Sequence, residues 1–108
     1  MGGKKSREKG KRGERELANR LSQLGIESHR GQQYRGSPES PDVVTDIEGL
    51  HIECKRVERF NLYEALIQAK NDAGNGVPVV AHRKNREPWV VVVELDNLLA
   101  LCKLINDR

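Results

Sequence analysis

The chain has 108 residues, of which 36% are hydrophobic and 32% carry a charge. This length predicts one domain with a small core, and no apolar run approaches the roughly 20 residues of a membrane-spanning helix. No apolar segment follows the basic N-terminus, so we expect neither a signal peptide nor a membrane partner. Cys54 and Cys102 lack the spacing of zinc ligands, which favours buried free thiols and a cytoplasmic protein.

The formal net charge is +3, but seven basic side chains lie within residues 1–15. Residues 1–9 are rich in Gly and Lys and predict a flexible basic arm ahead of one domain at residues 10–108. Such an arm suits the phosphates of a nucleic acid, although a solubilising tail has the same composition.

A first helix is expected to begin near residues 10–13 and to end at Leu24, because Leu17, Leu21 and Leu24 recur at helical spacing. Glu14 precedes Leu17 by three residues and therefore shares the apolar face. A carboxylate there either serves a site or favours the helix dipole.

Residues 26–30 predict a short strand, and residues 31–41 a long polar loop. A hairpin is predicted from strands at residues 42–47 and 50–57, with its turn at Glu48-Gly49. The expected elements after it are a helix at residues 62–73, buried strands at 77–81 and 89–95, and a last helix from Asp96 to about Ile105. This order predicts an α/β domain with a mixed sheet and helices on both sides.

The hairpin carries the chemistry of the chain. Glu53 and Lys55 are two residues apart on one strand and face the same way, and pairing of the strands can bring Asp42 near Glu53. Two carboxylates, the Cys54 carbonyl and Glu14 can hold a hard divalent cation, and Lys55 can act on a water or a phosphate. A surface ion pair between Glu53 and Lys55 is the alternative.

These residues resemble a known family. Ser40-Pro41-Asp42, followed after ten residues by Glu53-Cys54-Lys55, resembles the signature of the PD-(D/E)xK nuclease superfamily. Residues 9–17 resemble the opening helix of the archaeal-type Holliday junction resolvases, and the loop and hairpin follow in the order of that branch. The chain is shorter than typical members, which suits a compact phage version that would act in the host cytoplasm.

The resemblance implies a restriction-endonuclease-like fold, a homodimer and a four-way DNA junction as substrate. It implies a Mg²⁺ cofactor, for which Mn²⁺ substitutes. The site residues would be the acids Glu14, Asp42 and Glu53, the catalytic Lys55, the metal-binding Cys54 carbonyl and a supporting Gln68. The residues expected to contact DNA are Lys9, Lys11, Arg12, Arg15, Arg30, Arg35 and Ser37.

One part of the loop departs from the pattern. Those resolvases carry a serine before a glycine there, whereas this chain reads Arg35-Gly36-Ser37, so either Ser37 substitutes or Arg35 contacts the phosphate. Three hypotheses therefore stand: a metal-dependent junction endonuclease, a restriction- or repair-type nuclease on duplex or flapped DNA, and a non-catalytic DNA-binding module.

Overall fold

The computed structural model describes residues 3–31 and 41–108, with side chains described from residue 9 onward. Its strands are β1 (Ser28–Arg30), β2 (Val43–Thr45), β3 (Leu50–Arg56), β4 (Val77–Arg83) and β5 (Val90–Val92). Its helices are α1 (Gly3–Gln23), α2 (Leu62–Ala73) and α3 (Leu98–Asn106), with a 3-10 turn, η2 (Leu95–Asn97), directly before α3.

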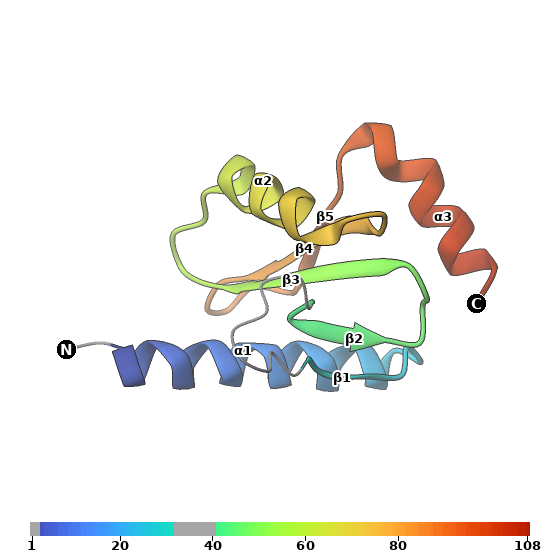
Figure 1. Ribbon diagram of the computed structural model, residues 1–108. Helices are drawn as coiled ribbons and strands as arrows, with labels where there is room; N and C mark the ends of the chain where they lie inside the picture. The colour runs from blue at the N-terminus through green and yellow to red at the C-terminus, as the bar shows by residue number, and fades with distance from the viewer. Residues whose placement is uncertain (1–2, 32–40) are drawn as a thin grey trace.

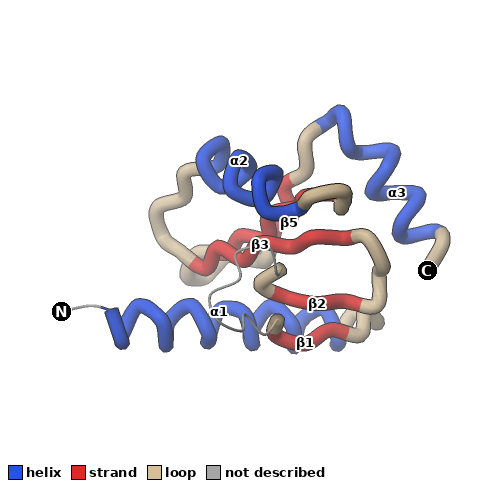
Figure 2. Tube along the Cα trace, in the orientation of Figure 1, coloured by secondary structure: helices blue, strands red, loops and turns tan. Residues whose placement is uncertain are grey.

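The strands form one mixed sheet in the order β1-β2-β3-β4-β5. The central pair, β3 and β4, is parallel and the other neighbours are antiparallel. Helix α1 covers one face of the sheet and α2 covers the other, while α3 stands at one end (Figures 1 and 2). The predicted α/β fold with a mixed sheet between helices is confirmed.

Helix α1 packs its apolar stripe on the sheet. Leu17 and Ala18 are buried against Val43, Ile52 and Ala81. The helix begins at Gly3, several residues before the expected start, and residues 3–9 are helical. Lys, Arg and Glu have high helix propensity, which favours a helix in this charge-rich segment. The helix ends at Gln23, close to the expected end at about Leu24, but Leu24 itself is exposed and does not belong to the buried stripe.

Helix α2 connects the two parallel strands. The Asn61 side chain accepts a hydrogen bond from the Glu64 N–H at 3.2 Å and caps the first turn. The inner face of α2, formed by Ala65, Leu66 and Ala69, packs on Val80 of β4. This packing places α2 over β4 and the adjoining β3.

The predicted hairpin is confirmed. Strands β2 and β3 are antiparallel, with Val43 opposite Ile52. Gly49 in the turn has a φ of 89°, which a residue without a Cβ adopts at little cost.

The C-terminal segment differs most from expectation. Val90 and Val91 of β5 are exposed, and Asp96 lies inside η2 rather than capping α3. None of the residues of α3, all of them described, is buried, and Cys102 is exposed. Among the described residues, no helix is long and apolar enough to cross a membrane.

Candidate active site

The carboxyl group of Asp42 lies beside that of Glu53 at the open end of the hairpin. The Cys54 N–H donates to Asp42 Oδ2 at 2.8 Å, and the Asp42 N–H donates to the Ile52 carbonyl at 3.0 Å. The Gly31 N–H donates to the Asp42 carbonyl at 2.8 Å. Asp42 is thus fixed from both sides, and its side chain also hydrogen-bonds Glu53.

The two carboxyl groups differ in charge. Burial, followed by the charge of Glu53, raises the pKa of Asp42 to about 7. Burial also acts on Glu53, which is only 3% exposed, but hydrogen bonds from His51 and Asp42 and the charges of His51 and Lys55 outweigh it and lower the pKa of Glu53. Below about pH 7 the pair therefore holds one proton, with Asp42 donating it to an ionised Glu53.

Lys55 lies two residues after Glu53 on the same face of β3. Its Nζ donates a hydrogen bond of 2.9 Å to Oε1 of Gln68. Gln68 lies on α2, about one turn after the buried Ala65. The structure therefore brings Gln68 to Lys55, as the sequence analysis expected. A hydrogen bond to a side chain held on a helix restricts the four-carbon stem of the lysine.

Glu14 approaches the pair from α1. Its Oε1 accepts a hydrogen bond of 2.9 Å from Nε of Arg30 on β1. Burial raises the pKa of Glu14 in spite of Arg30, and Glu14 interacts electrostatically with both Glu53 and Asp42. It is therefore near the pair but is held by an arginine.

The donor atoms suit a hard cation, which the family resemblance implies. Within residues 3–31 and 41–108, no three His, Cys, Asp or Glu side chains converge on a single metal position. Mg²⁺ does not need such a cage, because it binds one or two carboxylates and completes its shell with waters and substrate phosphates. Asp42 and Glu53 supply that number, and their mutual repulsion when both are ionised would be relieved by a cation.

The main chain and side chain of Cys54 point in different directions. Because its N–H faces Asp42, its carbonyl oxygen faces the same strand edge and is available beside the carboxylates. The thiol instead packs against the core cluster under α1. Burial raises the pKa of the thiol to about 12, so the sulfur stays protonated and is a packing group rather than a ligand.

His51 was missed by the sequence reasoning. Its ring lies on the same face of β3 as Glu53 and Lys55, and its Nε2 is 2.9 Å from Oε1 of Glu53. The spacing of residues 51, 53 and 55 could have predicted this contact, because alternate residues of a strand share a face.

The comparison with protein families agrees with this site. The family model of the archaeal Holliday junction resolvases (Hjc) matches residues 5–100, nearly the whole chain. The chain belongs to this family. The family is one of PD-(D/E)xK nucleases that act on Holliday junctions. Neither a curated protein nor a solved structure matches the chain.

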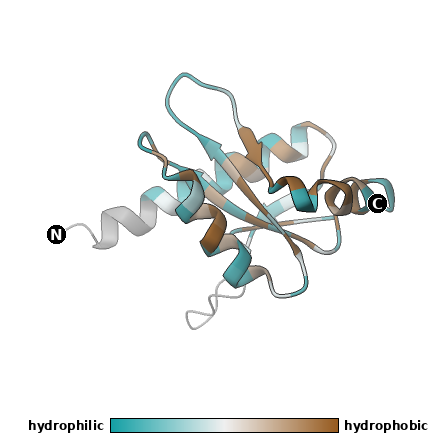
Figure 3. Ribbon diagram, turned by 90° about the horizontal axis from the view of Figure 1, so that it is seen from above, coloured by the Kyte–Doolittle hydropathy of each residue, from teal (hydrophilic) through white to brown (hydrophobic). Residues whose placement is uncertain are grey.

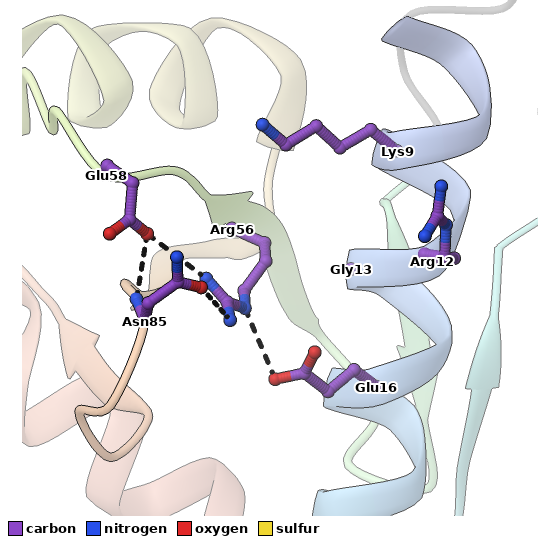
Figure 4. Close-up of a pocket in the computed structure, with 7 residues that line it drawn as sticks. All are labelled: Lys9, Arg12, Gly13, Glu16, Arg56, Glu58 and Asn85. Atoms are coloured by element: carbon purple, nitrogen blue, oxygen red, sulfur yellow. Dashed lines mark hydrogen bonds and ion pairs between the residues drawn. The ribbon is translucent and has the colours of Figure 1, made fainter. Parts of the chain in front are cut away.

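The basic residues of this resolvase family member fall into two groups. Arg30 and Arg15 act on Glu14, the first through an ion pair and the second through its charge, and Lys11 lies one turn before Glu14 on α1. Lys9 and Arg12 instead line a groove of about 650 Å³ on another side of the helix (Figure 4).

The groove is built around Arg56, at the end of β3. Its guanidinium donates to Asn85 at 2.9 Å and pairs with Glu16 at 3.4 Å and Glu58 at 3.5 Å (Figure 4). Arg83 also pairs with Glu16. This network ties α1 to β3 and β4, while Lys9 extends over the groove from α1.

Two expected DNA contacts, Arg35 and Ser37, lie outside the described residues.

Proposed function

We propose that the chain is a metal-dependent endonuclease that cuts four-way DNA junctions by hydrolysing one phosphodiester on each of two strands. The observation that carries the proposal is the contact between the Asp42 and Glu53 carboxyl groups, with Lys55 on the same face of β3. Family membership supplies the class of substrate.

Mg²⁺ held by Asp42, Glu53 and the Cys54 carbonyl would neutralise phosphate charge and lower the pKa of a water. Lys55, held by Gln68, offers a hydrogen bond and a positive charge to a phosphate oxygen as negative charge builds on it. In the reaction, a water oxygen bonds to phosphorus as the bond to the leaving oxygen breaks. Glu14 and its partner Arg30 border the same space and are placed to orient groups of the substrate.

A small cavity adjoins Lys55 on the α2 side. It has a volume of about 200 Å³. Its polar lining comes from Lys55, Arg59, Asn61, Glu64 and Gln68. Arg59 is exposed, and the Glu64 carboxylate accepts a hydrogen bond from the Asn61 amide. The two cations and the amide groups of this cavity can contact a backbone phosphate next to the cut, with Glu64 offsetting part of their charge.

Apolar surface on the C-terminal segment supports a homodimer. Leu95 is 82% and Leu99 83% exposed, and Val90 and Val91 lie on β5, the edge strand of the sheet. The hydrophobic colouring of α3 is plain in Figure 3. A second copy covering this surface would place two sites on one assembly, which suits paired cuts.

The deciding experiment compares a synthetic four-way junction, a flap and a linear duplex of equal length, at one salt concentration with Mg²⁺. Cut positions are read at nucleotide resolution on all strands. Symmetric nicks on the junction, absent with EDTA, are expected, and Asp42→Asn should abolish them while junction binding survives.

Equal cutting of duplex or flap would instead indicate a restriction- or repair-type nuclease. Binding without any cleavage in Mg²⁺ or Mn²⁺ would indicate a non-catalytic DNA-binding module.

A further inference from the structure

His51 is a buried polar residue that has no part in the proposed reaction. It is 5% exposed and lies on β3 opposite Pro78 of β4. A Cβ added to Gly76, in the turn between α2 and β4, would lie 3.7 Å from the Cβ of His51, so this turn comes close to the residue. On this face of β3, the buried His51 precedes Glu53 and Lys55 follows it.

The contact with Glu53 defines which atom of the ring carries hydrogen. An ionised carboxylate only accepts hydrogen bonds, so Nε2 of His51, at 2.9 Å from Oε1, is the donor. Glu53 is then held by His51 through Oε1 and also hydrogen-bonds Asp42. Without this hydrogen bond the terminal torsion of a glutamate is broad, and its two oxygens exchange places readily.

We propose that His51 is a positioning residue, which fixes the Glu53 carboxylate so that one of its oxygens faces Asp42 and the divalent cation. The inference rests on the proposed function, because it assigns His51 to the cation site formed by Asp42 and Glu53. Groups that hydrogen-bond a metal ligand from behind orient it, and their loss typically lowers metal affinity about 10- to 100-fold.

A purely structural reading makes a different prediction. A buried carboxylate needs a hydrogen-bond partner for the fold itself, and His51 would then contribute stability but leave the cation affinity of the folded chain unchanged. Cation affinity in the absence of DNA therefore separates the two roles.

The test measures Mn²⁺ binding to the DNA-free full chain from the electron paramagnetic resonance signal of free Mn²⁺. His51→Leu removes the donor and is expected to weaken Mn²⁺ binding about 10-fold or more. His51→Gln, whose amide nitrogen can reach the place of Nε2, should restore most of the affinity. His29→Gln, on an exposed histidine of β1, is the matched control and should bind as the wild type does.

Circular dichroism establishes which variants fold. If the Leu variant does not fold, the comparison of His51→Gln with His51→Asn decides, because both carry an amide but only the longer side chain reaches Glu53. Equal Mn²⁺ affinity of the folded Leu variant and the wild type, or of the Gln and Asn variants, would overturn the inference and leave the proposed function intact. A wild-type chain that binds no Mn²⁺ and cuts no junction would overturn the proposed function itself, and the inference with it.

Discussion

Asp42 and Glu53 hydrogen-bond to each other through their carboxyl groups, although ten residues separate them in the sequence and burial acts on both. The contact holds only while the pair retains a proton or a cation. This relationship makes the stability of the chain depend on pH and on metal.

The first prediction concerns pH. The pKa of Asp42 is about 7 in the folded chain and ordinarily 3.8, so the native state holds an extra proton between these values. Stability should therefore fall as pH rises through this window, at up to about 1.4 kcal/mol per pH unit. Urea denaturation in EDTA should show a much flatter profile for Asp42→Asn, whose amide oxygen can still accept from Cys54.

Asp96→Asn, an exposed aspartate in η2, is the control for loss of one negative charge. If it flattens the profile as much as Asp42→Asn does, the Asp42–Glu53 pair is not the cause. Addition of Mg²⁺ at pH 8 should raise the free energy of unfolding of the wild type but not of Asp42→Asn. At a Mg²⁺ concentration about ten times the dissociation constant, the expected increase is about 1.4 kcal/mol.

The second prediction concerns Gln68, the acceptor for Lys55. Gln68→Ala frees the ammonium group, and the single-turnover cleavage rate should fall roughly 10- to 100-fold, because displacement of a reacting group by about 1 Å costs that much. Stability should change by less than about 0.5 kcal/mol, since the residue is exposed. Asn71→Ala, on the same helix and also exposed, should leave the rate unchanged.

The third prediction concerns the approach of α1 to β3. A Cβ at Gly13 would lie 2.7 Å from Cβ of Arg56, so Gly13→Ala should lower the free energy of unfolding by about 1–3 kcal/mol. Gly10 lies one turn earlier, where an added Cβ would have nothing within 4 Å beyond the backbone of its own helix, and Gly10→Ala should raise that free energy by roughly 0.5–1 kcal/mol. Chemical denaturation of Gly13→Ala and Gly10→Ala measures the loss of stability expected for the first and the gain expected for the second. Equal changes in the two variants would contradict close packing at Gly13.

The fourth prediction concerns the apolar C-terminal surface. Leu99→Asp should convert the proposed dimer to a monomer in sedimentation velocity, because a buried carboxylate at an interface is costly. The isolated fold should be unaffected, since Leu99 is 83% exposed. Ile67→Asp makes the same change on the exposed face of α2 and is expected to leave the dimer intact. A wild-type chain that sediments as a monomer would refute this prediction.

Local pattern was sufficient to predict the hairpin and the contact between the side chains that it brings together. Alternation along β3 placed Glu53 and Lys55 on one face, and the Glu48-Gly49 turn returned the chain so that Asp42 met Glu53. Helical spacing placed Glu14 at the buried edge of α1. These relationships depend on periods of 2.0 and 3.6 residues, which the sequence carries directly.

Contacts between distant elements were not predictable in the same way. The pairing of Glu14 with Arg30, the partition of the basic residues of α1 between two sides of the helix, and the Arg56 network depend on where β1, β3 and β4 lie. The early start of α1 was missed because composition was weighed above helix propensity.

The sequence by itself predicted the fold class, the hairpin and the face that Glu53 and Lys55 share, because short-range periodicity and turn chemistry specify them. Only the tertiary structure decided how those groups are charged and which group stands behind them. Burial raises the pKa of Asp42, and His51 reaches Glu53, because α2 and the strands around β3 remove water from that face. The dielectric environment of a residue comes from the packing of the whole fold, which no local pattern encodes.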